Sequence, residues 1–283
     1  MTANIIFDSL EKGKWIRKIS YLRELKFSNE DIICFKFDKS LDEKDIQPMH
    51  LVTFACLIEH FSYVSSIQLS SDNLEIANLI IGKLRYHEYF QGKLNHVEST
   101  EEHIFNLWRI IESEKDLYAK QVESYFERIM TNKDLSVISL NLMEAFYNIF
   151  DHANANGNAF SLIKFDTEKG ILYASICDFG IGIARSVRNY CTAINDDREA
   201  LQKAIQTNFT VRSKIHNSGK GLDNILSAST NVRIFCNNAL LVKLNGLEPK
   251  ILSTDFEFNG TLIYFEIDLN ESEDVEIIDE FEL

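Results

Sequence analysis

The first part of the chain alternates between strand-like and helix-like hydrophobic patterns. Residues 31–37, DIICFKF, are rich in β-forming side chains, and residues 65–71 form a second short run of this kind. Between them, residues 47–61 carry apolar side chains at helical spacing, and the same spacing recurs over residues 73–90. This strand–helix–strand–helix order predicts a small α/β domain over residues 1–97.

Residues 98–130 follow a long, mostly polar pattern with a stripe of apolar residues at helical spacing. We expect a connecting helix over this range. It either bridges or docks on a domain, or pairs with another chain in a homodimer. The stripe consists of Ile104, Trp108, Ile111, Tyr118, Val122, Phe126 and Ile129.

The pattern over residues 131–270 predicts a second α/β domain, followed by a solvated acidic tail at 271–283. The expected elements are a helix over 135–153, two strands joined by a turn at Glu168-Lys169-Gly170, one or two short helices in a polar region over 181–218, a helix over 220–229, a hairpin turning at Asn237-Asn238, and a final strand over 260–269.

Composition narrows the classes of partner. The chain has 283 residues and a formal net charge of −14. Nucleic acids and anionic membrane surfaces need clustered Lys and Arg, so neither is an expected partner. A nucleotide with Mg²⁺ is still compatible with an acidic protein, because the metal bridges phosphate oxygens to it.

The cysteines indicate a reducing compartment. There are five, an odd number, mostly in apolar runs and without a C-x-x-C pair. They are typical of reduced core residues rather than of a disulfide framework. The N-terminal residues lack the basic start and apolar block of a signal peptide. We therefore expect a cytoplasmic protein.

Three polar residues share one face of the predicted 135–153 helix. Glu144, Asn148 and His152 follow one another at four-residue spacing. A carboxamide oxygen can ligate Mg²⁺, and a carboxylate one turn earlier can orient or deprotonate an attacking hydroxyl. The alternative is an ordinary solvated helix face, with His152 as a structural residue.

Glycines gather at three other places. Asp178 stands at a predicted strand end, with Gly180 and Gly182 directly after it. Residues 219–222, GKGL, precede a predicted helix, whose free N–H groups favour a phosphate. Gly260 and Thr261 open the last strand. Each alone could be a turn, but this order and spacing are hard to obtain by accident.

Together, these motifs resemble the GHKL superfamily, the histidine-kinase-like ATPases built on the Bergerat fold. EAFYNIFDHA is similar to its N box, DFGIGI to its first glycine box and GKGL to its second. Among subfamilies, NIFDHA and the compact lid look most like the anti-sigma-factor serine kinases. The resemblance covers about half of the chain and implies a two-layer α/β sandwich with a mixed sheet.

The resemblance also implies roles in binding Mg²⁺ and ATP. Glu144 would be the general base or water-orienting carboxylate, and Asn148 would hold Mg²⁺. Asp178 would accept a hydrogen bond from the adenine amino group, with Thr261 behind the ring. His152 would be a further ATP contact.

The remaining implied contacts concern the nucleotide's phosphates and the loop that covers them. Gly180 and Gly182 would let the backbone pass close to the nucleotide. Residues 183–218 would form the ATP lid. The implied phosphate-facing residues are Thr210, Arg212, Lys214, Gly219, Lys220 and Gly221.

The N-terminal domain resembles a STAS-type domain, the fold of anti-anti-sigma factors. In that family the phosphoacceptor serine would lie near the start of the helix at 48–60, where Thr53 is the nearest hydroxyl. We therefore expect this domain to dock a protein partner rather than to be phosphorylated within the same chain.

Three functions are compatible with these patterns. The first is a Mg²⁺-dependent ATPase or serine/threonine protein kinase in bacterial-type regulation. The second is an ATP-gated interaction switch with little turnover, and the third is a scaffold with a vestigial site. A histidine autokinase is not expected, since His103 lacks the acidic residue and proline that normally follow an acceptor histidine.

Overall fold

A computed structural model describes residues 2–152, 158–206 and 221–271. Several residues with predicted roles lie outside this description, as does most of the acidic tail: the side chain of His152, and Thr210, Arg212, Lys214, Gly219 and Lys220. Within the described residues, no helix is long and apolar enough to cross a membrane.

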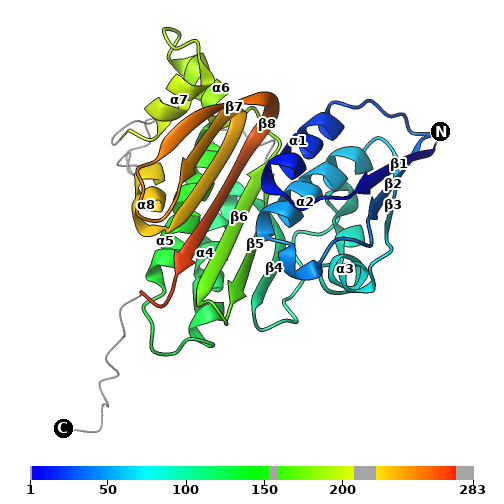
Figure 1. The fold of residues 1–283 in the computed structure, drawn as a ribbon, viewed down its shortest axis with the longest axis horizontal. Helices are drawn as coiled ribbons and strands as arrows, with labels where there is room; N and C mark the ends of the chain where they lie inside the picture. The colour runs from blue at the N-terminus through cyan, green and yellow to red at the C-terminus, as the bar shows by residue number, and fades with distance from the viewer. Residues whose placement is uncertain (1, 153–157, 207–220, 272–283) are drawn as a thin grey trace.

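Residues 2–97, the N-terminal unit, contain a parallel three-stranded sheet in the order β1-β2-β3 (Figure 1). Its elements are β1 (Thr2–Phe7), α1 (Lys12–Arg23), β2 (Ile32–Phe37), α2 (Pro48–Ser62), β3 (Ser66–Ser71) and α3 (Leu74–Ala77), followed by a π-helical turn (Asn78–Lys83) and a 3₁₀ segment (Tyr86–Gly92).

The predicted strands at 31–37 and 65–71 and the helix at 47–61 are confirmed. Pro48 occupies the first turn of α2, where its missing N–H costs no helical hydrogen bond. The single helix expected over 73–90 is wrong, because Arg85 adopts a left-handed conformation with φ of 50° and interrupts it.

The second part of the chain forms a five-stranded sheet in the order β4-β5-β6-β8-β7. Its strands are β4 (Ile104–Ile111), β5 (Asn158–Asp166), β6 (Ile171–Asp178), β7 (Asn231–Lys243) and β8 (Lys250–Asp268). Every described pairing is antiparallel, so the expected mixed sheet is wrong. Two of the pairings, β5-β6 and β7-β8, are between strands that follow one another in the chain, and the distant pairing of β6 with β8 is antiparallel as well.

The helices of this part are α4 (Lys115–Glu127), α5 (Ser136–Tyr147), a π-helical turn (Asn148–His152), α6 (Ile183–Tyr190), α7 (Asp197–Ala204) and α8 (Gly221–Ala228). A 3₁₀ turn at Glu112–Glu114 precedes α4, and another at Glu43–Asp45 precedes α2 in the N-terminal unit. The two short helices expected within 181–218 correspond to α6 and α7, and the strands on either side of Gly170 are confirmed.

The connecting helix expected over 98–130 is only half right. Residues 115–127 are helical, but residues 104–111 form β4. A β-bulge between Phe105 and Trp108 shifts the alternation of β4, so these two side chains pack on the same face of the sheet. A spacing of three along a bulged strand mimics one turn of a helix.

The hairpin turn expected at Asn237-Asn238 is also wrong. Strand β7 runs through these residues, and the connection to β8 lies at residues 244–249. Asn237 has φ of 51° and sits at a register shift between β7 and β8. The Asn-Asn pair therefore makes a bulge rather than a chain reversal.

The five-stranded sheet is covered on both faces (Figure 1). Helices α4, α5 and α8 pack on one face, in a core that includes Phe146, Ile176 and Phe265. On the other face, α1 and α2 lie between the two sheets, and Phe54 belongs to the same core as Phe160 of β5. The N-terminal unit is thus packed directly against the back of the sheet that carries Asp178 at the end of β6. The last strand begins at Lys250 rather than at the expected residue 260, so Gly260 and Thr261 lie within β8 instead of opening it.

Candidate functional site

Asp178 is the last residue of β6 and is fully buried. It pairs with Thr261 of β8. Strand alternation places it on the same face as Ala174 and Ile176, which pack against the α5 side of the sheet. Its Oδ1 accepts a hydrogen bond from the Gly180 N–H at 2.5 Å. Its Oδ2 is buried and accepts no hydrogen bond from the described residues.

Burial raises the pKa of Asp178 to about 7. The Gly180 N–H, the charge of Arg23 and contacts with Thr261 act in the opposite direction, but together they do not offset the loss of water. Burial of a carboxylate is unfavourable, and here one of its oxygens also lacks a hydrogen-bond donor among the described residues. Both properties are typical of carboxylates that bind a ligand.

Two glycines let three backbone segments meet at Asp178. Gly182 has φ of 85°, and a Cβ there would lie 2.5 Å from Asn237 Oδ1 and 2.7 Å from the Gly260 carbonyl oxygen. Gly260 has φ of 129°, and a Cβ there would collide with the Asp178 backbone. Both positions require glycine, for conformation and for space.

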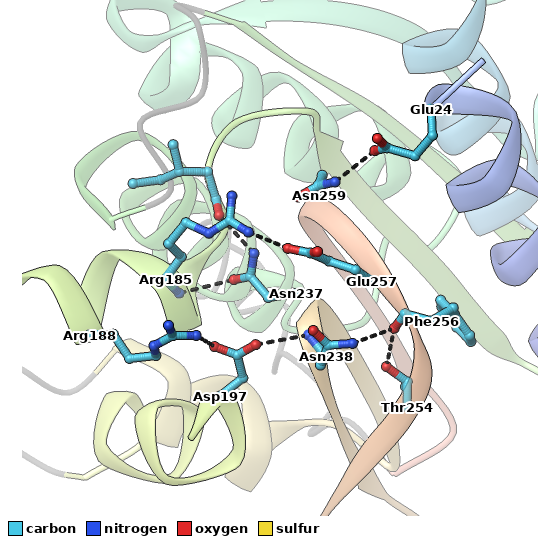
Figure 2. Close-up of polar contacts among 11 residues, drawn as sticks. Glu24, Arg185, Arg188, Asp197, Asn237, Asn238, Thr254, Phe256, Glu257 and Asn259 are labelled. Atoms are coloured by element: carbon cyan, nitrogen blue, oxygen red, sulfur yellow. Dashed lines mark hydrogen bonds and ion pairs between the residues drawn. The ribbon is translucent and has the colours of Figure 1, made fainter. Parts of the chain in front are cut away.

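Asn237 fixes the segment that follows Gly180 (Figure 2). Its Nδ2 donates to the Ile181 carbonyl at 2.9 Å, and its Oδ1 accepts from the Arg185 N–H at 3.0 Å. The side chain of Arg185 pairs in turn with Glu257 of β8. The β7 bulge that misled the hairpin prediction therefore anchors the start of α6.

Replacing Asn237 with alanine is expected to lower the free energy of unfolding by about 2 kcal/mol. The variant loses two hydrogen bonds in a buried place and puts a residue without αL preference at φ of 51°. Asn238→Ala is the matched control, because Asn238 is exposed. Urea unfolding of both variants tests this, and equal losses would contradict the anchoring role of Asn237.

Glu144 and Asn148 lie one turn apart at the end of α5. Glu144 is half-buried, and burial raises its pKa. Asn224 of α8 donates from Nδ2 to Glu144 Oε1 at 3.5 Å. Asn148 is buried and donates from Nδ2 to the Glu144 carbonyl at 2.7 Å. This bond orients the amide, so Asn148 Oδ1 is its remaining acceptor, which suits a hard cation.

Contacts between elements bring the two halves of the candidate site together. α6, which follows Gly182, touches the π-helical turn that contains Asn148, and α8 packs along α5. Gly221 is the first residue of α8, which lies within the helix predicted over 220–229. Thr261 Oγ1 accepts from the Ile183 N–H at 3.3 Å, which ties β8 to the start of α6.

Sequence reasoning missed three residues of this site. Asn224 follows Gly221 by one helical turn, a spacing that offered a signal. The Asn237-Asn238 pair is typical of a turn, and it predicted a hairpin where the structure has a bulge in β7. Arg23 of α1 donates to the Phe179 carbonyl at 2.8 Å. No local pattern connects Arg23 with a residue so distant in the sequence.

No protein-family model matches the chain, and no curated protein matches it.

Proposed function

We propose that the protein binds Mg²⁺-ATP as a regulatory protein of the GHKL type, with a Bergerat-fold nucleotide site in residues 131–270. The observation that carries the proposal is Asp178, a fully buried carboxylate with one oxygen lacking a donor among the described residues. An exocyclic amino group of adenine supplies a donor of that kind.

The adenine end of the site would be formed by Asp178 and Thr261. They are cross-strand partners on the face of the sheet that α4, α5 and α8 cover. The glycines at 182 and 260 support this assignment because their positive φ and missing side chains bring the turn after β6, β7 and β8 together around Asp178. Thr261 would lie behind the ring.

The phosphate end would be formed by α5 and the start of α8. Asn148 Oδ1 is available to Mg²⁺, which would bridge phosphate oxygens to this acidic protein. Gly221 opens α8, whose N-terminal N–H groups favour a phosphate. His152, Thr210, Arg212, Gly219 and Lys220 complete the proposed set by resemblance alone.

Glu144 is the group that we propose for catalysis. It is one turn from Asn148, and the pKa raised by burial moves it toward that of a useful general base. The hydrogen bond from Asn224 fixes one of its oxygens. A water or a protein hydroxyl would be activated by the carboxylate, which gives an ATPase or a serine/threonine kinase respectively.

An ATP-gated interaction switch is the second candidate. It is favoured by the packing of α1 and α2 against the back of the sheet behind Asp178. In this function, ATP would change a surface that binds a protein partner, with the STAS-like N-terminal unit as docking platform. Thr53 is fully buried and donates to the Met49 carbonyl, so it is not proposed as a phosphoacceptor.

Thermal unfolding with and without Mg²⁺-ATP tests the nucleotide site. A ligand at a hundredfold excess over its Kd adds about 2.7 kcal/mol to stability. We expect this shift in the wild type and in Glu144→Ala, and none in Asp178→Asn. The absence of a shift in the wild type would overturn the proposed function.

Phosphate release and phosphotransfer then separate the two candidates. Glu144→Ala should lose turnover by about a hundredfold or more if the protein is an enzyme, because general-base catalysis contributes about that factor. A switch keeps its response to ATP in this variant and shows negligible turnover in the wild type.

A further inference from the structure

The C-terminal end of α1 reaches across to the turn that follows Asp178. Arg23 Nη2 donates to the Phe179 carbonyl at 2.8 Å. The Arg23 guanidinium carbon also lies 4.4 Å from the centre of the Phe179 ring, in a cation–π arrangement. Its Nη1 is buried without a hydrogen-bond partner among the described residues. One side chain of the N-terminal unit thus holds both the backbone and the ring of Phe179.

Glu24, the C-cap residue that follows α1, contacts the neighbouring strand β8. Glu24 accepts a hydrogen bond from Asn259 Nδ2 at 2.8 Å (Figure 2). Asn259 precedes Gly260, whose backbone is pressed against Asp178. The last residue of α1 and its C-cap residue therefore hold the turn after Asp178 and the part of β8 that carries Thr261.

Arg23 supplies the cationic charge that acts on Asp178. The cavity that both residues line also contains Glu59 and Arg109, whose charges pair with each other. The nearby thiols are Cys56 on α2, Cys177 on β6 and Cys236 on β7, and burial raises the pKa of each thiol. His60 of α2 lies beside Arg23, and burial lowers its pKa. Thiols and imidazole are thus neutral near pH 7, and Arg23 supplies the positive charge that favours ionised Asp178.

We propose that Arg23 is a positioning residue for the adenine site, through which the N-terminal unit sets the affinity for nucleotide. Its hydrogen bond to Phe179 fixes the turn after Asp178, and its charge keeps the Asp178 carboxylate an acceptor. A partner that shifts α1 would thereby weaken or strengthen ATP binding. This inference rests on the proposed nucleotide site.

The test compares three variants of the full chain by titration with Mg²⁺-ATP at pH 8. Arg23→Met keeps the apolar stem and removes the guanidinium, and should weaken ATP binding about tenfold, as expected for loss of a charged hydrogen bond. Arg23→Lys restores the charge and should recover most of the affinity. Arg17→Met is the control, since Arg17 lies on the same helix but pairs with exposed Asp255.

The pH dependence of binding separates positioning from simple loosening of the fold. Wild-type affinity should fall as the pH drops through about 7, because protonated Asp178 no longer accepts from adenine. In Arg23→Met the midpoint should move to higher pH, while Arg23→Lys and Arg17→Met keep it. An equal loss of affinity at every pH would overturn the electrostatic part of the role.

Hydrogen exchange without nucleotide decides the inference independently of the proposed function. Amides at residues 179–182 and 260–261 should exchange about tenfold faster in Arg23→Met than in Arg17→Met, because the brace on the turn is lost. Wild-type exchange at these amides in Arg23→Met would overturn the inference. If exchange is faster in Arg23→Met but ATP does not bind even the wild type, the role of Arg23 in fixing this turn is supported and the proposed nucleotide function is wrong.

Discussion

Replacing Gly260 with alanine is expected to lower the free energy of unfolding by about 4 kcal/mol. At φ of 129° the backbone is in a region that side chains rarely adopt. The new Cβ would also lie 3.0 Å from the Phe179 Cα and closer still to the Asp178 carbonyl oxygen. These are backbone atoms of the next strand and its turn, so no flexible side chain can move aside.

Gly246→Ala is the matched control for this prediction. Gly246 also has a positive φ, of 72°, but nothing lies within 4 Å of where its Cβ would be. Its cost should be about 1 kcal/mol, from backbone conformation alone. Urea unfolding of both variants separates the two contributions. Equal losses would mean that the contact between Gly260 and Asp178 is looser than the geometry indicates.

The sequence predicted those parts of the fold that depend on local periodicity. The helix around Glu144, the β5–β6 hairpin and the start of α8 at Gly221 follow from spacing and turn residues close together in the chain. The α/β class followed from their order. These elements lie near the places where they were expected because no distant contact overrides their local preference.

The errors arose where distant contacts decide the structure. The bulge in β4 exists because Phe105 and Trp108 both pack against α4, including Tyr118. The bulge at Asn237 exists because its amide binds α6 and the preceding turn. In both cases a local pattern had two interpretations, and packing selected the one that sequence spacing did not favour.

The candidate site divides in the same way. Asp178, Glu144 and Asn148 could be named from the sequence, since their chemistry and spacing are local. The contribution of Arg23 could not, because it depends on the packing of α1 and α2 against the back of the antiparallel sheet. Composition gave no sign of a core shared between the parallel and antiparallel sheets.

The stability of the Asp178→Asn variant should depend on pH differently from that of the wild type. Asp178 has a folded-state pKa of about 7, above the ordinary value of 3.8, so the folded state holds this proton more tightly than the unfolded state. The wild type should therefore lose stability as the pH rises from about 4 to about 7, and no more above it. The change is on the order of 4 kcal/mol, which asparagine does not undergo.

The prediction concerns the difference between the two pH profiles, because asparagine leaves an amide nitrogen in place of Oδ2 at every pH. Relative to the wild type, Asp178→Asn should gain on the order of 4 kcal/mol between pH 4 and pH 8 in urea unfolding without nucleotide. Asp255→Asn, an exposed substitution on the same sheet, should follow the wild-type profile closely. Parallel profiles for Asp178→Asn and the wild type would show that the carboxylate is not buried as described.

The same variant links stability to the proposed function. At pH 8 the nucleotide-free wild type has lost stability through ionisation of Asp178, a loss that the asparagine variant does not undergo. Such a cost is typical of groups arranged for ligand binding rather than for folding. Saturating Mg²⁺-ATP should return stability to the wild type by donating to Asp178 Oδ2, and should leave Asp178→Asn unchanged. If ATP stabilises both proteins equally, adenine is not read by this carboxylate, and the cost of burying it needs another explanation.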